Sequence, residues 1–404
     1  MEDLVSINNL NIEARTRAGT LKVVKDLSFT IKKGETLCVV GESGCGKSVT
    51  ALSLMSLLPE GILRVSSGDI LFDGINLAQL SEAELEGIRG NEISMIFQEP
   101  MTSLNPLFSV GEQVSEVIRR HKKLNKEKAW ASAIELLDAV KIANPDKRAL
   151  DYPFQLSGGQ RQRVMIAIAL ACRPKILIAD EPTTALDVTI QAEILALINR
   201  LKEETGTAVM FITHDMAVVA QMADRVVVMY QGKKVEEGTV HEIFNNPQHE
   251  YTKSLLAAVP KLGEMATKKY PEPMRLVGDK KSKVLKPIIG TNEPLLKVNS
   301  LVTRYPVKGG IFRRTVARVH AVEDVSFTLM KGKTLALVGE SGCGKSTVGR
   351  SLIRLVEPTS GDVDLDGQSL LSLNPKEMRE ARSNIQMVFQ DPFSSLNPQR
   401  PLFD

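Results

Sequence analysis

One octapeptide, Gly-Glu-Ser-Gly-Cys-Gly-Lys-Ser, occurs twice in this chain, at residues 41–48 and again at 339–346. The offset between the copies is about 290–300 residues, which is far longer than any solenoid period, so the repeat predicts a duplicated domain. The neighbouring segments repeat at nearly the same offset, 24–29 as 322–327 and 97–106 as 389–398.

The repeat divides the chain into three expected parts. Residues 1–260 are predicted to form one complete domain. Residues 261–293 are rich in Lys and Pro and are expected to be a linker or a small appended element. Residues 294–404 are expected to be the N-terminal part of a second domain, since everything that the first copy carries beyond Pro106 has no counterpart there.

The composition excludes several functional classes. With 43% hydrophobic and 25% charged residues the chain is globular, and a net charge of +3 gives no support for a nucleic-acid partner. The four cysteines form no CxxC pair, which argues against a zinc site or a disulfide framework and fits a reducing cytosol. No apolar run approaches the roughly 20 residues of a membrane helix, so a role at a membrane would require docking onto another protein.

Each octapeptide matches GxxxxGK[ST], the phosphate-binding P-loop. Residues 36–40 and 334–338 are predicted to be short buried strands before it, and 48–58 a helix after it that Pro59 stops. A chance glycine-rich turn is the alternative, but two identical copies in matching context disfavour it. The spacing also excludes the dinucleotide fingerprint. The candidate nucleotide-binding residues are Gly41, Ser43, Gly44, Cys45, Gly46, Lys47, Ser48 and Val49, then Gly339, Gly342, Gly344, Lys345, Ser346 and Thr347.

Within this loop each residue type has a chemical task. Glycines allow the backbone N–H groups to wrap around phosphates, Lys47 would reach the β- and γ-phosphates, and Ser48 would hold Mg²⁺. Farther along, an apolar strand at 176–179 ends in Asp180 and Glu181. Asp180 would bind the hydrated Mg²⁺ and Glu181 would act as general base toward water, the alternative being that these acids only begin a loop.

Two more segments suggest phosphate chemistry. The apolar run 208–212 ends next to His214. A histidine there is more often structural, but neighbouring parallel strands would present His214 and Glu181 to one γ-phosphate. Ser157, Gly158, Gly159 and Gln160 precede a helix predicted at 161–171 and form another anion-binding helix N-terminus. One domain needs no second phosphate site, so this one is expected to face a different subunit.

In this order the motifs resemble those of the nucleotide-binding subunit of an ATP-binding cassette (ABC) transporter. The resemblance implies an α/β P-loop NTPase fold: a RecA-like core, an antiparallel β-subdomain and a helical insert near 111–170, here duplicated with the second copy incomplete. It makes Gln98 and Gln390 the Q-loop glutamines that contact the γ-phosphate and Mg²⁺. Tyr305 would stack on adenine. Ala14 or Arg15 stands at the matching place in the first copy, where an Arg15 guanidinium stack is the alternative.

The resemblance extends to a subclass. FQEPMTSLNP at 97–106 and NPQHEYT at 246–252 are similar to importers of dipeptides, oligopeptides, nickel or glutathione, and a tandem arrangement resembles the fused members. This implies ATP and Mg²⁺ as cofactors and a peripheral position on the cytoplasmic face of the inner membrane. The implied partners are two membrane-spanning permease subunits, a solute-binding protein and a second cassette. Residues 230–290 contain no cysteine, so no iron–sulfur cluster is expected there.

In this family ATP lies between the P-loop of one cassette and the LSGGQ signature of another. The second copy lacks its signature and catalytic acids, so we expect first cassettes to pair between two chains. We also expect residues after about 295 to be sensitive to proteases. The alternatives are a soluble tandem-cassette ATPase not coupled to transport, or an ATP-binding fragment without turnover.

Overall fold

The computed structural model describes residues 2–400 apart from 18, 99–102, 185, 260–262, 264–291, 310–313, 341, 390–396 and 398. The chain divides into two compact units, Met1–Leu285 and Lys286–Asp404, and each is described by itself. The finer division at residues 260 and 293 stays a prediction, because most of residues 261–293 lie outside the described part.

The first unit is built around a six-stranded sheet in the order β10-β9-β3-β8-β7-β6, in which only β10 is antiparallel to its neighbour. Both faces of a parallel sheet are covered, which accounts for the continuous apolar runs in the sequence. The strands are β3 (Thr36–Val40), β6 (Ile93–Ile96), β7 (Ile176–Asp180), β8 (Ala208–Thr213), β9 (Arg225–Tyr230) and β10 (Lys233–Thr239).

Alternate side chains of these strands pack into two hydrophobic cores. Along β3, Leu37 and Val39 belong to a core shared with an antiparallel sheet, while Cys38 and Val40 belong to a core shared with helices. This alternation follows from the two-residue period of a strand. Cys38 is fully buried, and burial raises the pKa of its thiol, so Cys38 acts as a small apolar residue.

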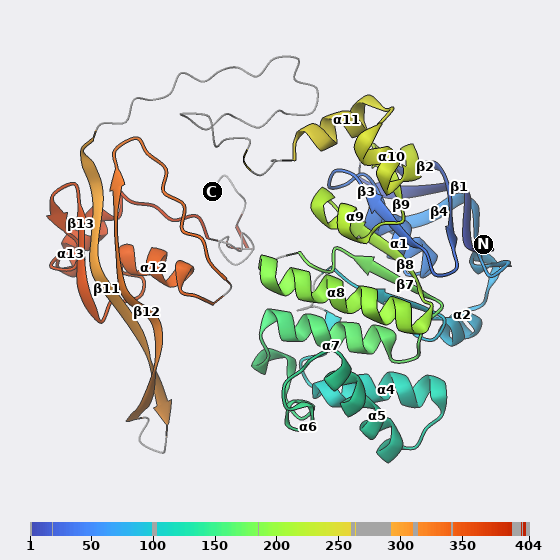
Figure 1. The fold of residues 1–404 in the computed structure, drawn as a ribbon, viewed down its shortest axis with the longest axis horizontal. Helices are drawn as coiled ribbons and strands as arrows, with labels where there is room; N and C mark the ends of the chain where they lie inside the picture. The colour runs from blue at the N-terminus through green and yellow to red at the C-terminus, as the bar shows by residue number, and fades with distance from the viewer. Residues whose placement is uncertain are drawn as a thin grey trace. The chain divides into compact units, whose positions relative to one another are not determined.

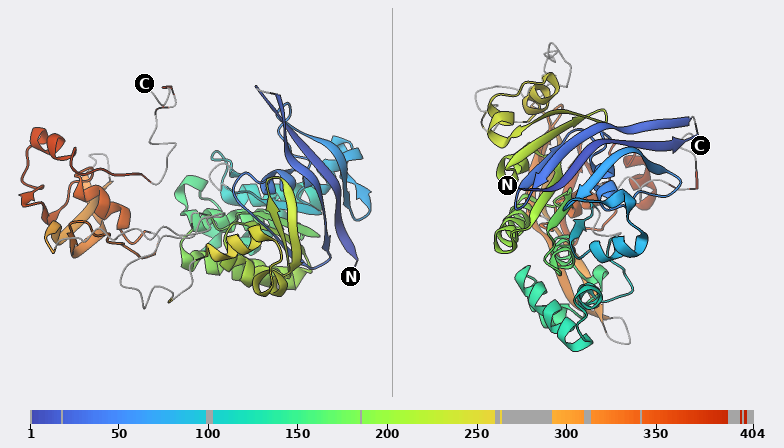
Figure 2. Two further views of the ribbon diagram at one scale, coloured as in Figure 1. Left: turned by 90° about the horizontal axis from the view of Figure 1, so that it is seen from above. Right: turned by 90° about the vertical axis from the view of Figure 1, so that its right-hand side faces the viewer.

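The antiparallel layer has the order β2-β1-β4-β5. β1 (Asp3–Thr16) and β2 (Gly19–Lys32) run side by side as a long hairpin (Figure 2), followed by β4 (Leu63–Phe72) and β5 (Ile75–Asn76). The 3-10 turn η1 (Leu77–Gln79) and helix α2 (Glu82–Ile88) lead back into β6.

Helix α1 (Lys47–Leu54) follows the phosphate loop and ends earlier than predicted. Ser56 adopts a left-handed φ of 50°, and the N–H groups of Ser56 and Leu57 donate to the carbonyls of Ser53 and Leu52. This Schellman motif stops the helix before Pro59 is reached.

Figure 1 shows helices α4–α7 gathered at one end of the first unit, with β1, β2 and β4 at the other. No helix within the described ranges is long and apolar enough to cross a membrane. The helices after β6 are α4 (Val110–Lys122), α5 (Lys126–Ala139), α6 (Pro145–Arg148), α7 (Gly158–Leu170), α8 (Val188–Thr205), α9 (Met216–Met222), α10 (Val240–Asn245) and α11 (Glu250–Ala257), with the 3-10 turn η2 (Pro153–Gln155) before α7. The expected P-loop core, β-subdomain and helical insert are therefore confirmed.

The second unit repeats the antiparallel layer of the first in the order β12-β11-β13-β14. Val298 pairs with Phe327 and Val363 as Ile7 pairs with Phe29 and Ile70. Figure 1 shows α12 beside the long hairpin β11–β12. Its elements are β11 (Pro294–Gly309), β12 (Arg314–Met330), α12 (Lys345–Leu352), β13 (Ser360–Leu365), β14 (Gln368–Ser369) and α13 (Pro375–Ala381).

The predicted strand at 334–338 is wrong: these residues form no strand, and Leu335, Leu337 and Val338 are 44%, 45% and 88% exposed. In the first unit the equivalent β3 is paired with β8 and β9 on its two sides. Among the described residues of the second unit no strand occupies the places of β8 and β9, so the backbone groups of 334–338 have no strand there to pair with.

This difference predicts where a protease cuts first. Limited digestion with thermolysin, which cleaves beside large apolar residues, should open the chain within 334–338 before it touches residues 36–40. The equivalent β3 residues Leu37, Val39 and Val40 are fully buried and serve as the internal control. Mass spectrometry of the first fragments checks this, and cleavage of both segments at equal rates would contradict it.

Candidate nucleotide-binding site

The phosphate loop leaves the carboxyl end of β3 and enters α1. Gly41 has a φ of 149°, and a Cβ there would lie 2.1 Å from the backbone oxygen of Met229. Gly46 caps α1 with a φ of 103°, another conformation that side chains disfavour. Gly41 packs against the backbone at the end of β9 and Gly46 packs against β2, which together with the φ values accounts for glycine at both positions.

Lys47 is buried at the base of this loop. Its ammonium donates hydrogen bonds to the backbone oxygens of Gly41 at 2.7 Å and Glu42 at 2.9 Å. In the second unit Lys345 makes the same two contacts, at 2.6 Å each, to Gly339 and Glu340. The octapeptide therefore sets the lysine geometry by itself, in both copies.

Asp180, at the end of β7, lies beside the phosphate loop. The Ser48 hydroxyl donates to the Asp180 carboxylate at 3.0 Å, so the structure brings these two sequence candidates together. Burial, and to a smaller degree the neighbouring Glu181 carboxylate, raise the pKa of Asp180 despite the Ser48 hydrogen bond. A buried carboxylate next to a hydroxyl suits Mg²⁺, which takes one or two carboxylates together with phosphate oxygens and water. Among the described residues, no group of three or more His, Cys, Asp or Glu side chains is placed to hold a metal ion.

Glu181 is the point where three strand ends meet. It accepts hydrogen bonds from Gln98 Nε2, after β6, at 3.2 Å and from Thr184 Oγ at 2.9 Å, while His214 Nδ1, after β8, lies 3.2 Å from its other oxygen. Its backbone has a φ of 46°, a strained conformation for a non-glycine residue that is typical of functional sites. The geometry therefore brings together the predicted Gln98, Glu181 and His214.

The signature residues form the N-terminus of α7. Ser157 Oγ accepts from the Gln160 N–H at 3.3 Å, and the Gln160 side chain accepts from the Ser157 N–H at 3.0 Å, which is a capping box. Ser157 is exposed and Gly158 has open space around it, whereas Gly159 fits closely against Ile190. The predicted segment is thus the capped N-terminus of α7, with Ser157 exposed at its start.

The two copies differ where an adenine ring is expected. In the second unit Tyr305 lies beside the phosphate-loop helix, with its hydroxyl 3.4 Å from Thr347 Oγ. In the first unit the equivalent position on β1 is Ala14, and Val49 takes the place of Thr347. The first copy therefore has no ring at this position.

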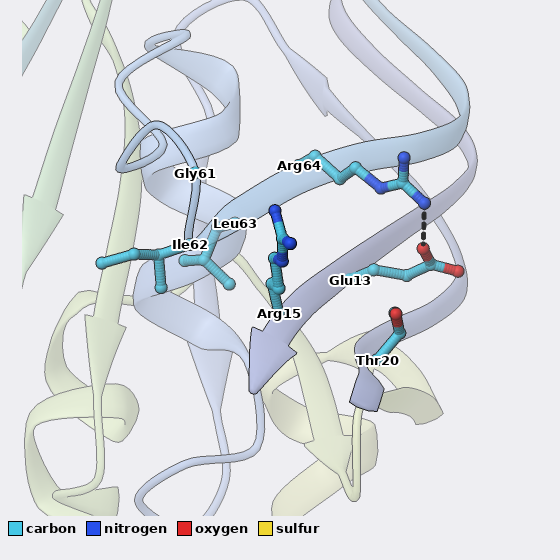
Figure 3. Close-up of a pocket in the computed structure, with 7 residues that line it drawn as sticks. All are labelled: Glu13, Arg15, Thr20, Gly61, Ile62, Leu63 and Arg64. Carbon is cyan, nitrogen blue, oxygen red and sulfur yellow. Dashed lines mark hydrogen bonds and ion pairs between the residues drawn. The ribbon is translucent and has the colours of Figure 1, made fainter. Parts of the chain in front are cut away.

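Arg15, the next residue of β1, lines a cavity of the first unit. Figure 3 shows Arg15 in a cavity of about 340 Å³, next to the Glu13–Arg64 ion pair. No residue of the phosphate loop lines this cavity. An Arg15 stack on adenine therefore stays a prediction.

The second copy assembles less of a site. Ser346 is exposed, and Gln390 lies outside the described residues. Two contacts of the first copy were not predicted from the sequence: Thr184 supports Glu181, and Tyr251 reaches the backbone of Glu42. Tyr251 belongs to the NPQHEYT segment, which indicated the subclass but did not predict a contact with the phosphate loop.

A glycine-rich loop at the end of a central parallel strand, with a buried aspartate on its serine, defines a P-loop nucleotide-binding cassette. Residues 24–184 and 322–403 match the family described as ABC transporter, and residues 235–278 match the oligopeptide/dipeptide transporter C-terminal region. The chain belongs to the ABC transporter family, with a nucleotide-binding domain and this C-terminal region.

Individual relatives agree with this assignment. The glutathione import ATP-binding protein GsiA of Escherichia coli O157:H7 is 50% identical over all of this chain, and that of Salmonella choleraesuis is 50% identical over 98% of it. The chain spans 66% of the length of each of these relatives.

Solved structures give the same fold. The cassette MJ0796, determined as a dimer in a post-hydrolysis state bound to ADP and Pi, has a TM-score of 0.53 and 31% identity, covering 58% of this chain and 98% of that one. The cassette cbiO1 of Clostridium perfringens, part of an ABC transporter complex, has a TM-score of 0.52 and 29% identity, covering 61% of this chain and 92% of that one.

Supplying the missing ring should strengthen nucleotide binding by the first copy. Aromatic stacking on a base contributes about 1–3 kcal/mol, so Ala14→Tyr should lower the Kd for ATP about 5-fold or more. Titration with a fluorescent ATP analogue in a Lys345→Ala background, which silences the second loop, measures this. Ala14→Leu is the matched control, and an equal gain in that variant would show that apolar contact rather than stacking is responsible.

Proposed function

We propose that this chain is the ATP-binding and ATP-hydrolysing subunit of an importer for peptides of the dipeptide, oligopeptide and glutathione class. The observation that carries the proposal is the convergence of a phosphate loop, Asp180 and Glu181 at one sheet edge in a chain with the oligopeptide/dipeptide C-terminal region. The similarity to glutathione import proteins supports the substrate class.

The proposed chemistry follows from the contacts in the first copy. The loop N–H groups and Lys47 would bind the phosphates, and the Ser48 and Asp180 oxygens would hold Mg²⁺, which adds positive charge near the transferred phosphoryl group. Glu181 would accept a proton from the attacking water. Gln98 and His214, both beside the Glu181 carboxylate, would orient this base and sense the γ-phosphate.

A complete site needs a signature from outside the cassette. We propose that the helix N-terminus at Ser157 faces the phosphate loop of a second copy of this chain, so that two first cassettes pair. The exposure of Ser157 and the capping of α7 within its own first turn support this arrangement. A solved relative, MJ0796, is itself dimeric.

Exposed apolar residues just before α4 and between α6 and α7 support docking to permease subunits. Leu107, Phe108, Leu150 and Phe154 are 79%, 51%, 64% and 69% exposed. Backbone hydrogen bonds from Val110 to Asp151 and from Gly111 to Ala149 hold these segments together, and Gln113 binds the carbonyls of Asn105 and Phe108. We call these four residues the apolar docking patch and propose that it binds membrane subunits at the cytoplasmic face of the inner membrane.

Pairing of two chains predicts a concentration-dependent ATPase. The steady-state rate should rise faster than linearly with protein concentration, because two chains must meet to complete a site. Glu181→Gln should reduce the rate by about 10²–10⁴-fold, since it removes the base but keeps the side-chain shape. Glu203→Gln, on the exposed side of α8, is the control.

The outcomes separate the alternatives. A rate per chain that stays constant on dilution would contradict pairing, and undiminished turnover in Glu181→Gln would contradict the role of the base. Bound ATP without turnover in the unaltered protein would favour an ATP-binding fragment over a working ATPase.

The apolar docking patch predicts a selective loss of partner binding. Phe108→Glu or Leu150→Glu should abolish co-purification with co-expressed permease subunits, because a charge would have to be desolvated in the interface. ATP binding should be unchanged in both. Ile75→Glu, at an equally exposed apolar residue of β5, is the matched control. Retention of the permease by all three variants would remove the patch from the interface.

A further inference from the structure

The C-terminal part of the first unit reaches the phosphate loop directly. The hydroxyl of Tyr251, on α11, accepts a hydrogen bond from the backbone N–H of Glu42 at 3.0 Å. Tyr251 is only 4% exposed, and burial raises its pKa to about 12, so the hydroxyl is neutral at any physiological pH. Glu42 is the second residue of the loop, and its carbonyl accepts from Lys47.

The ring of Tyr251 is fixed from a second side. It stacks on the ring of Tyr230 with the ring centres 4.2 Å apart. Tyr230 follows Met229, whose backbone oxygen is the atom that leaves no room for a Cβ at Gly41. The end of β9 and the start of α11 therefore support the first turn of the phosphate loop together.

The start of α11 is itself anchored. Glu236 of β10 accepts hydrogen bonds from the N–H groups of Gln248 at 2.6 Å and His249 at 3.1 Å. His249 Nδ1 then accepts from the Tyr251 N–H at 3.1 Å and caps the helix. A continuous set of hydrogen bonds and one ring stack thus runs from β10 to the backbone of the loop.

We propose that Tyr251 is a positioning residue for the first phosphate loop, and that residues 246–251 transmit the position of α11 to the nucleotide site. Tyr251 acts through the loop backbone and touches no phosphate. A loop held at Glu42 presents its N–H groups in the geometry for phosphates before the nucleotide arrives, so less ordering opposes binding. The proposal rests on the proposed nucleotide-binding function of this loop.

The first test is backbone hydrogen–deuterium exchange of the nucleotide-free full chain. Tyr251→Phe removes one oxygen, keeps the ring stack and leaves the Glu42 N–H without its acceptor. Exchange in the fragment spanning residues 39–46 should become several-fold faster. The identical octapeptide at 339–346, distinguished by its flanking residues, is an internal reference and should not change.

Tyr230→Phe is the matched control. It also removes a phenolic oxygen from the stacked pair, but within the described residues the hydrogen bond to that oxygen comes from the exposed Gln231 side chain, at 3.2 Å. Exchange at residues 39–46 should therefore stay unchanged in this variant. Equal acceleration in both variants, or at both octapeptides, would show general loosening and would overturn the proposal, as would unchanged exchange in Tyr251→Phe.

The second test is nucleotide affinity in the Lys345→Ala background. The loss of one hydrogen bond, with its partner left unpaired, should raise the Kd for ATP about 3- to 10-fold in Tyr251→Phe and leave it unaltered in Tyr230→Phe. An unchanged Kd with accelerated exchange would overturn the positioning role. Failure of every variant to bind ATP would instead reject the proposed function, while the exchange result on the free protein would still stand.

Discussion

The site depends on the parallel pairing of β3 with β8 on one side and β9 on the other. The carboxyl ends of parallel strands lie at one edge of the sheet. This pairing therefore brings the loop after β3 next to Asp180, the last residue of β7, and His214, which follows β8. The second unit shows what remains without it. Lys345 still contacts the carbonyls of its own loop, but residues 334–338 are exposed and unpaired.

Local and long-range order therefore contribute separately. The octapeptide fixes the lysine through contacts within six residues, and these contacts are the same in both copies. The carboxylate side of the site comes from more than a hundred residues away, as the Ser48–Asp180 hydrogen bond illustrates. A phosphate loop is thus a local structure, whereas a hydrolytic site is a property of the whole sheet.

This distinction explains which predictions from sequence were correct. The apolar runs at 176–179 and 208–212 do form strands, β7 and β8, because each has hydrogen-bonded neighbours in the same unit. The strand at 334–338 has the same apolar pattern as 36–40 but fails, because a strand requires hydrogen-bonding neighbours that a pattern does not reveal. Helix α1 ends earlier than predicted because Ser56 adopts a left-handed conformation. Glycine usually occupies such a position, so no residue of this segment indicated the helix end.

At the site itself, residue types were predictable and mutual contacts were not. Gln98, Glu181 and His214 were each chosen from their motifs, but their meeting at one carboxylate depends on strand order. The contact between Tyr251 and Glu42 joins residues 209 positions apart. Nothing in the sequence of either segment identifies the other, since a backbone N–H can donate to any suitable acceptor.

The electrostatics of the first site explain why nucleotide and metal would bind together. Lys47 is a buried cation whose nearest acceptors are neutral carbonyls. Asp180, which binds the adjacent Ser48, is a buried carboxylate whose pKa is raised by burial and by Glu181. Each charge is costly to bury by itself. Phosphates would offset the lysine and a divalent cation would offset the two carboxylates, so either ligand alone would leave one side of the site uncompensated. A metal–nucleotide complex would satisfy both sides at once, so we expect this arrangement of charges to favour it over either ligand alone.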